Sequence, residues 1–256
     1  MTFQQASLSF EMAPRAGHGR EFTARRRVRL GDATPNGRLR LDSIARYLQD
    51  VSNDDTRDAQ WSDPHWWVVR RTVIDVHEFP QYLEEINLIT WCGGLGSHWA
   101  ERRTQITSLD GRVLVDAAAL WVHVDKETLQ PSRVPEDVVE LLTTSSGGRS
   151  VGARLLLRQK DFAANATIVP SPWVLRFSDF DAVGHMNNAA YWEMVEEHLA
   201  QYRDLRAPLR GVVEHVVQVE EGQNAVRLSA VDGSELDLQL VVGETVHAAM
   251  WCGTLI

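Results

Sequence analysis

Apolar and polar residues alternate near the start of the chain, and the spacing of the apolar residues then changes. Phe22, Ala24, Val28 and Leu30 are separated by threonine and arginine side chains, an alternation that has the period of a β-strand. Over residues 41–51, leucine, isoleucine, alanine and valine recur every three or four positions, which places them on one face of a helix. The pattern therefore predicts a strand that ends near Leu30, followed by a helix.

The same pattern occurs a second time, with residues 175–197 repeating residues 28–50. In both windows an apolar run ends at an aspartate, a short turn passes through a glycine, and a helical periodicity begins. The windows align without a gap at an offset of 184 − 37 = 147, with three identities: Arg29 and Arg176, Asp32 and Asp179, Gly37 and Gly184. Since a repeat can reveal the folding unit, we expect two similar units in the chain.

Each predicted helix is followed by a series of predicted strands. After the first helix these strands cover 67–79, 84–94, 98–109 and 112–125, and after the second they cover 212–220, 224–232, 234–242 and 245–256. Asp110-Gly111 and Asp232-Gly233 are two-residue turn sequences, which favour antiparallel hairpins. Each half is therefore predicted to be a strand, a helix and an antiparallel meander.

A single helix next to so many antiparallel strands buries its apolar face by lying across the sheet, which then curls around the helix. Two such units predict two sheets that pair edge to edge and leave fewer exposed edges. Proline and glycine mark residues 131–170 as a connector. We therefore expect an N-terminal domain over 20–130, a linker over 131–170 and a C-terminal domain over 171–256.

The composition is that of a globular protein with a large core. The 256 residues carry a formal net charge of −9, which argues against a nucleic-acid partner. Cys92 and Cys252 lack metal-ligand spacing and are expected to be buried, reduced thiols. The first twenty residues lack the apolar core of a signal peptide, and no apolar run is long enough to span a bilayer. We expect a soluble, cytoplasmic protein without membrane contact, metal or cofactor.

Residues 176–192, RFSDFDAVGHMNNAAYW, gather acidic, histidine and asparagine side chains between a predicted strand and a predicted helix. Much of this polarity is explained by turn chemistry. Asp179 has Asp32 opposite it in the first copy, and is therefore expected to be structural. Asn187 and Asn188 are common N-cap residues, for which capping is favoured over catalysis.

Asp181 and His185 are different, because the fold alone does not demand them. The first copy has Thr34 and Arg38 at the equivalent positions, so the same turn forms there without an acidic residue and a histidine. A paired carboxylate and imidazole can serve as base, nucleophile or proton carrier. The repeat therefore predicts one active site for each chain, in the second half.

The segment SDFDAVGHMNNAAYWE resembles the pattern S-D-x-D-x-N-x-H-x-N-N-x-x-Y of the fatty acyl-acyl carrier protein thioesterases of plants and bacteria. The resemblance extends from about Phe22 to Ile256 and includes WVVRRTVIDVHEFP in the first half. It implies an α+β fold of two hotdog domains in tandem, each with an antiparallel sheet wrapped around a central helix. It also implies hydrolysis of fatty acyl-acyl carrier protein (acyl-ACP) to free fatty acid, with ACP as partner and no cofactor.

Carried over by position, the resemblance places the family's catalytic aspartate at Asp181 and its histidine at His185. The family's asparagine falls on Val183, whose side chain cannot form hydrogen bonds. When Gly222 is aligned with the glycine of the family's glutamate-cysteine-glycine sequence, the glutamate falls on Glu220 and the cysteine on Glu221. The predicted catalytic residues are Asp181, His185 and Glu220.

Thioester hydrolysis needs an activated water or a nucleophile, together with donors for the developing oxyanion. We expect Glu220 or Asp181 to be the base or nucleophile and His185 to orient the thioester carbonyl or the water. The second helix is predicted to begin within 185–188, where its first amides could bind the oxyanion. A cysteine nucleophile is disfavoured by Glu221.

Other features leave alternatives open. Tryptophans of the first half either line an acyl pocket or, as the simpler interpretation, pack in the core: Trp66, Trp67 and Trp99. Arginines and one lysine could form a docking face for an acidic carrier protein, or simply solubilise the strands: Arg25, Arg26, Arg27, Arg70, Arg71, Arg102, Arg103, Arg154, Arg158 and Lys160.

Three activities therefore remain possible from the residues alone: an acyl-ACP thioesterase, an acyl-CoA thioesterase, and a hotdog protein that binds acyl groups without hydrolysing them. Val183 and Glu221 keep the last alternative open. The chain could be a monomer or a homodimer, because a tandem pair already mimics a hotdog dimer.

Overall fold

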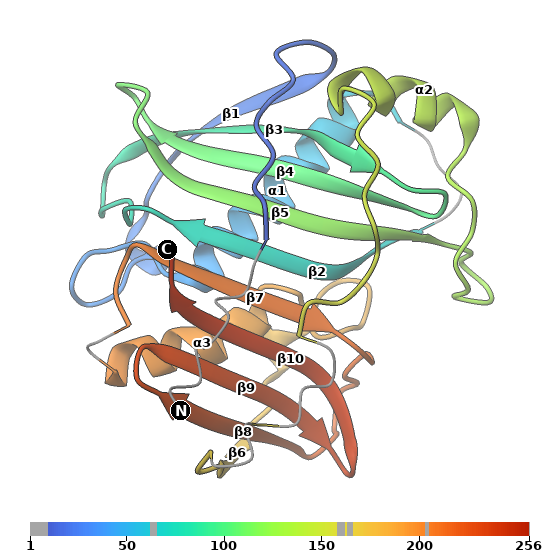
Figure 1. Ribbon diagram of the computed structural model, residues 1–256. Coiled ribbons are helices and arrows are strands. Elements are labelled where there is room, and N and C mark those ends of the chain that lie inside the picture. Colours follow the sequence, from blue (N-terminus) through green and yellow to red (C-terminus); the bar gives the residue numbers. More distant parts are fainter. Residues whose placement is uncertain (1–9, 62–65, 158–161, 163–165, 203–204, 256) are drawn as a thin grey trace, which may run out of the picture.

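The computed structural model of the protein describes residues 10–61, 66–157, 162, 166–202 and 205–255. Within these ranges the chain forms one antiparallel sheet in the order β1-β3-β4-β5-β2-β7-β10-β9-β8-β6 (Figure 1). The N-terminal strands are β1 (Glu21–Arg27), β2 (Trp66–Val76), β3 (Glu85–Leu95), β4 (Trp99–Ser108) and β5 (Val113–Val124). The C-terminal strands are β6 (Val169–Trp173), β7 (Leu209–His215), β8 (Ala225–Asp232), β9 (Glu235–Val242) and β10 (Thr245–Thr254).

Each half contains the predicted unit of strand, turn, helix and four further strands. The helices are α1 (Leu41–Asp58) in the first half and α3 (Ala190–Gln201) in the second, and short 3-10 turns precede them at Leu30–Asp32 and Phe177–Asp179. In both 3-10 turns the aspartate accepts a hydrogen bond from the backbone N–H of the preceding arginine, Arg29 or Arg176. The structural role predicted for Asp32 and Asp179 is thus visible in their contacts.

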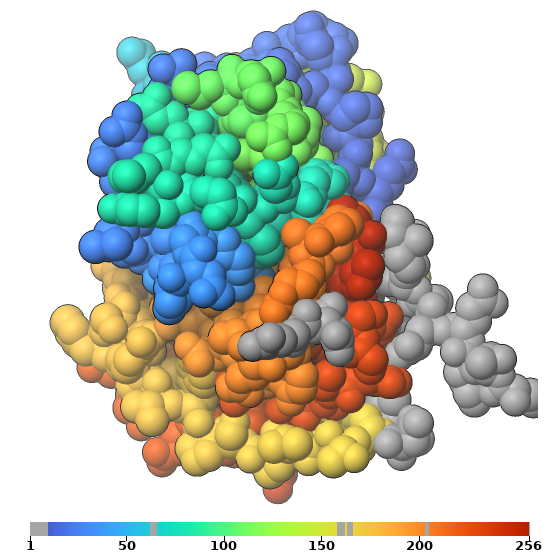
Figure 2. All heavy atoms as spheres, turned by 90° about the vertical axis from the view of Figure 1, so that its left-hand side faces the viewer, coloured from blue at the N-terminus to red at the C-terminus, as the bar shows by residue number. Residues whose placement is uncertain are grey.

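The two halves are joined through β2 and β7, which pair antiparallel from Arg71↔Glu214 to Val76↔Leu209. The two sheets that the repeat predicts are therefore halves of one continuous sheet. In the space-filling view, the N-terminal half, from blue to green, meets the C-terminal half, from yellow to red, along a continuous boundary (Figure 2). Because β2 and β7 pair with each other, neither of them is left as a sheet edge.

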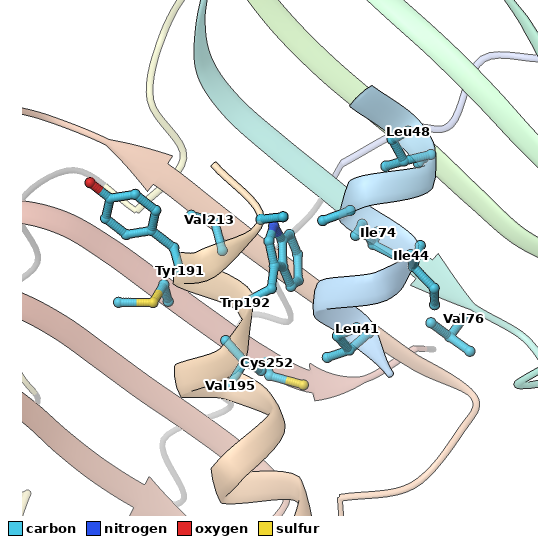
Figure 3. Packing of buried hydrophobic residues seen from close by; sticks show 14 of the residues in the cluster. Leu41, Ile44, Leu48, Ile74, Val76, Tyr191, Trp192, Val195, Val213 and Cys252 are labelled. Atoms are coloured by element: carbon cyan, nitrogen blue, oxygen red, sulfur yellow. The ribbon is translucent and has the colours of Figure 1, made fainter. Parts of the chain in front are cut away.

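Both long helices lie on the same face of the sheet and pack against each other. From α3, Trp192 points toward α1, whereas Tyr191 points away from it (Figure 3). Trp192 is 1% exposed, and a Cβ placed on Gly211 would lie 2.7 Å from its ring, so the ring rests directly on the backbone of β7. The shared core of α1, α3 and the inner sheet face fixes how the two halves meet.

The turn before α1 strengthens the contact between α1 and α3. Arg38 donates to both carboxylate oxygens of Glu196 on α3, at 3.2 and 2.6 Å, and its guanidinium stacks over the ring of Phe79. Glu196 also accepts a hydrogen bond of 3.0 Å from the N–H of Leu41, at the start of α1. A carboxylate of α3 thus stabilises the positive N-terminal end of α1.

The opposite face of the sheet is covered by irregular segments, among them the one with Leu156 and Leu157. The helix α2 (Glu136–Ser145), which lies inside the predicted linker, packs instead on Cys92 and Ala100, near the end of α1. On the opposite face Arg103 is 1% exposed and pairs with Glu101, while Arg71 is 4% exposed and stacks on Phe10. Arg102 faces the helices and pairs with Asp55. The predicted docking face is therefore wrong for Arg71 and Arg103, which are buried, and for Arg102, whose side chain is 16% exposed and turned toward α1. Arg158 and Lys160 lie outside the described residues.

Both cysteines are buried and free, as predicted. Burial raises the pKa of the Cys92 thiol to about 11 and that of Cys252 to about 12, so both remain protonated at neutral pH.

None of the helices in the described part of the chain combines the length and the apolar character that crossing a bilayer requires. The domain limits at 130 and 171 stay predictions, although the ribbon shows where the two halves meet (Figure 1).

Candidate active site

The turn before α3 has a backbone geometry that both copies share. Asp181 N–H donates to His185 O at 3.0 Å, and Gly184 N–H donates to Asp181 O at 2.9 Å. The first copy forms the equivalent bonds with Thr34 and Arg38 in place of Asp181 and His185, and Gly37 and Gly184 have the same φ of 87°. The fold therefore needs this turn but does not need a carboxylate and an imidazole in it.

The Asp181 carboxylate is held in place from two sides. Its Oδ1 accepts the N–H of Val183 at 3.0 Å, and its Oδ2 accepts the side-chain amide of Asn187 at 3.2 Å. Asn187 in turn accepts the N–H of Ala189 at 2.9 Å, next to the start of α3. The N-cap of α3 is Ala189 rather than Asn187, and Asn187 binds the turn just before the helix and orients Asp181.

Asp181 and His185 line a common cavity of about 690 Å³. The wall includes Val183 and Asn188 from the same turn, Trp66 and Trp67 from β2, and the segment 215–218 after β7. The structure thus brings together two of the three predicted catalytic residues and two of the three tryptophans. Trp99 is not in this wall, because its indole N–H donates to Val151 O at 2.8 Å instead.

Glu220 occupies a different place. It is exposed and is not part of the cavity wall, and its N–H donates to Gln223 Oε1 at 3.1 Å. Gln218, two residues earlier, lines the cavity instead. Glu220 follows Val219, whose carbonyl accepts the N–H of Met186 at 3.4 Å. Glu220 therefore lies beside the site, and its catalytic role stays a prediction.

The start of α3 offers a backbone donor to the cavity. The helix begins at Ala190, slightly later than the predicted 185–188. At the offset of 147, Asn188 corresponds to Leu41, whose N–H is bound by the Glu196 carboxylate. Among the described residues, no group accepts the N–H of Asn188. The N–H that a carboxylate occupies in the first half thus has no such partner in the second, where Asn188 lines the cavity.

The repeat also identifies the residue that corresponds to Glu196 and is therefore expected near the N–H of Asn188. At the same offset, the counterpart of Glu196 is Gln49 on α1. Gln49 and Asn188 line the same small cavity of about 20 Å³ between the two helices. A neutral glutamine thus stands where a glutamate would occupy the amide, which leaves the amide free for a substrate oxygen.

His215 forms part of the cavity wall behind Asp181 and His185. Its ring packs edge-on against Tyr191 at 4.7 Å between centroids, and its Nε2 is buried without a partner among the described residues. Burial, and next the positive charge of Arg70, lowers the pKa of His215 to about 4. The site therefore contains a neutral imidazole at physiological pH.

The His215 ring gives the fold a defined pH dependence. Its pKa is about 4 in the folded chain, against 6.5 as the ordinary value. As pH falls from 6.5 to about 4, the unfolded chain takes up this proton and the folded chain does not, which lowers stability by up to roughly 3 kcal/mol. Replacing His215 by phenylalanine is expected to make the loss of stability over this range shallower. Denaturant unfolding at several pH values tests this, and parallel curves for both proteins would contradict it.

Comparison with known protein families assigns the chain to one of them. Residues 19–142 match the model of the acyl-ACP thioesterase N-terminal domain, and residues 165–245 match the model of its C-terminal domain. The chain belongs to the acyl-ACP thioesterase family. An uncharacterized protein of Mycobacterium tuberculosis is 32% identical to this thioesterase over 240 residues, which cover 93% of this chain and 94% of the relative. A chloroplastic palmitoyl-acyl carrier protein thioesterase of Arabidopsis thaliana is 28% identical over 130 residues, 49% of this chain and 31% of the relative.

Solved structures show the same fold at lower identity. A Lactobacillus plantarum protein, provisionally described as an oleoyl thioesterase, has a TM-score of 0.79 at 19% identity and covers 93% of this chain and 96% of its own. The 12:0-ACP thioesterase of Umbellularia californica has a TM-score of 0.74 at 18% identity, covering 92% and 97%. These similarities place this thioesterase in the fold of the family.

Several residues of the site escape sequence reasoning. His215 is the last residue of β7, and Gln218 follows an irregularity in the pairing with β10, where the N–H groups of Val216 and Val217 both donate to His247 O. No local pattern in the sequence indicates this irregularity. Gln49 could have been found, because the aligned repeat sets it opposite Glu196. In the ranges that the structure describes, no three His, Cys, Asp or Glu side chains are grouped to hold a metal ion.

Proposed function

We propose that the cavity beside Asp181 and His185 is where this thioesterase hydrolyses fatty acyl-ACP. The observation that carries the proposal is the contrast between the two helix entries. The N–H of Leu41 is occupied by Glu196, whereas its counterpart at Asn188 has no acceptor among the described residues, and Asn188 lines a cavity that Asp181 and His185 also line. The chain is a thioester hydrolase by family, and this contrast favours the second half as its site.

The proposed reaction adds water across the thioester. Asp181 accepts a proton from a water molecule, whose oxygen attacks the carbonyl carbon, and the carbonyl oxygen becomes an oxyanion held by the N–H of Asn188. The C–S bond then breaks, and the thiolate leaves with the proton as the free thiol of the carrier. His185 orients the water or the carbonyl. The hydrogen bonds from Val183 N–H and Asn187 to the Asp181 carboxylate fix its position.

Glu220 is the second candidate for the base. It stands directly after Val219, at the edge of the cavity wall, but its side chain is exposed. Asp181 is favoured because it lines the cavity and its orientation is fixed. The valine at 183 removes a side-chain amide from the rim, and the amide of Gln218 is available on the opposite side. The base-and-water route needs neither an asparagine at 183 nor a cysteine at 221.

The fold, in this proposal, is a tandem hotdog with one unit over 20–130, a linker over 131–170 and a second unit over 171–256. The arrangement of α1 and α3 on one face of a shared sheet supports it.

The carrier protein would deliver the acyl group through the mouth of the cavity, where Arg70 contributes a positive charge next to Val216 O, to which it donates at 3.0 Å. A CoA thioester and a purely acyl-binding role are the alternatives, and the oligomeric state, monomer or homodimer, is a separate prediction.

Replacing Gln49 by glutamate tests the proposal through the oxyanion donor. The change copies the Leu41–Glu196 arrangement onto the second half and is expected to place a carboxylate on the N–H of Asn188. We expect thiol release from acyl-ACP to slow by about 10²–10³-fold, the usual effect of losing one oxyanion donor, with the melting temperature unchanged or higher. Gln49→Met is the control, because it leaves the amide open. Equal activity of Gln49→Glu and wild type would contradict the proposal.

A further inference from the structure

A second cavity of about 270 Å³ lies at the far end of α1, on the face of the sheet that the helices cover. Its wall is unusually aromatic, with tryptophans from β2, β3 and β5 and from the segment just after α1: Trp61, Trp67, Trp91 and Trp121. Trp67 also lines the cavity of the proposed active site. The two cavities are thus separated by little more than one side chain.

A narrow slot lies between the two regions and shares lining residues with both. The slot, of about 20 Å³, is lined at one end by Asn188 and at the other by Ser52, Arg102 and Trp121, and the last three also line the second cavity. Its remaining wall contains four alanines: Ala45, Ala117, Ala119 and Ala189. A space of about 20 Å³ holds little more than one water molecule, so an acyl group held at Asn188 that extends toward Arg102 and Trp121 has to widen it, and the alanine side chains keep its wall small.

The end of this path is polar. Asp55 is 6% exposed and accepts hydrogen bonds from Arg20 at 2.9 Å and from Arg102. Two guanidinium groups therefore meet one buried carboxylate, although Arg20 also pairs with the exposed Asp58. Among the described residues, the partners of Arg102 are Asp55 and Thr90, and both are reached through Nη1. The other donors of Arg102 remain available to the cavity.

Trp121 adds an independent signal. Its indole N–H is buried and has no acceptor among the described residues, and a buried donor without a partner costs about 1–3 kcal/mol. A methyl group at this end would leave the indole donor unpaired and would lie against the Arg102–Asp55 ion pair. An oxygen atom would accept from the indole N–H and from Arg102.

We propose that the second cavity binds an oxygen function, a hydroxyl or a carboxylate, at the distal end of the acyl chain, so that this thioesterase prefers ω-oxygenated acyl groups to methyl-terminated ones. The inference rests on the proposed function, because it takes the thioester carbonyl to lie at Asn188. The inference specifies the class of acyl group that is preferred, which the site at Asp181 and His185 does not determine.

The test compares acyl-ACP thioesters of equal length that end in a methyl, a hydroxyl or a carboxyl group, over a series of lengths. For at least one length, we expect kcat/KM to be about tenfold or more higher for an oxygenated substrate, because a site with unpaired polar groups rejects ligands that cannot bond to them. Trp121→Phe, which removes the N–H and keeps an aromatic ring, should bring this ratio close to one, and Arg102→Met should lower it. Trp99→Phe is the control, since Trp99 donates to Val151 O outside both cavities.

The outcomes separate the inference from the proposed function. Efficient hydrolysis with a preference for methyl-terminated chains at every length would overturn the inference and leave the proposed function intact. A preference that Trp121→Phe and Arg102→Met do not change would also overturn it. If no thioester is cleaved, the proposed function fails. The inference is then decided by whether free ω-hydroxy fatty acids raise the melting temperature of wild type more than that of Trp121→Phe.

Discussion

Replacing Asp181 by asparagine is expected to lower kcat/KM for acyl-ACP hydrolysis by roughly 10²–10⁴-fold, the range that a positioned acid or base contributes. The asparagine keeps the size of the side chain and its Oδ1 can still accept from Val183 N–H, so the turn should survive. What is lost is the proton acceptor for the attacking water. His185→Ala is expected to reduce kcat/KM as well. Thiol release measured with a chromogenic thiol reagent gives both values.

Two further variants sharpen this result. Thr34→Val changes the counterpart of Asp181 in the first copy, where the buried hydroxyl has no partner in the part of the chain that the structure describes, and should leave activity intact. Glu220→Gln decides between the two candidate bases: Asp181 is the base if Asp181→Asn is inactive and Glu220→Gln is active. The reverse result would move the base to Glu220 and contradict the assignment drawn from the cavity wall.

Replacing Trp192 by alanine is expected to lower the free energy of unfolding by about 3–5 kcal/mol, as is typical for removing a buried aromatic ring. The ring is 1% exposed, points from α3 toward α1 and rests on the backbone at Gly211 (Figure 3). Its removal leaves a cavity at the contact between the two halves, which cannot collapse without moving α1 or β7. Urea unfolding followed by circular dichroism measures the effect.

Trp66→Ala is the matched comparison, because this tryptophan is 39% exposed and a partly exposed ring contributes less burial. Its loss is expected to cost less than half as much stability as that of Trp192. Equal losses would mean that the contact between α1 and α3 does not dominate the stability of the joined halves. Trp192→Phe should lie between wild type and Trp192→Ala.

Much of the fold can be predicted from the sequence, because the strands have period-two patterns and the two copies confirm each other. The four strands after each helix lie within a few residues of their predicted positions. The helix α2 was not predicted, since it has only 10 residues and its buried side chains, Val138 and Leu142, are too few to establish a period. The pairing of β2 with β7 depends on long-range contacts that no local pattern encodes.

The residues of the candidate site could be predicted where the two copies carry different side chains at equivalent positions. They could not be predicted where distant segments of the chain come together only on folding. Asp181 and His185 stand out because Thr34 and Arg38 occupy the same turn. The burial of Arg71 and Arg103 could not be predicted, because alternation in a strand does not reveal which segments cover its outer face. The second cavity combines residues from four strands and two helices, and only the folded chain brings Trp121, Arg102 and Asp55 together.

The most direct test of the central claim is the initial rate of thiol release by the wild-type protein from matched fatty acyl-ACP and acyl-CoA thioesters. We expect hydrolysis of both the methyl-terminated and the ω-oxygenated acyl-ACP substrates, with a higher kcat/KM for acyl-ACP than for the CoA thioester of the same acyl group. If the protein cleaves neither thioester while acyl ligands still raise its melting temperature, the cavity beside Asp181 and His185 binds acyl groups without hydrolysing them, and the account is contradicted.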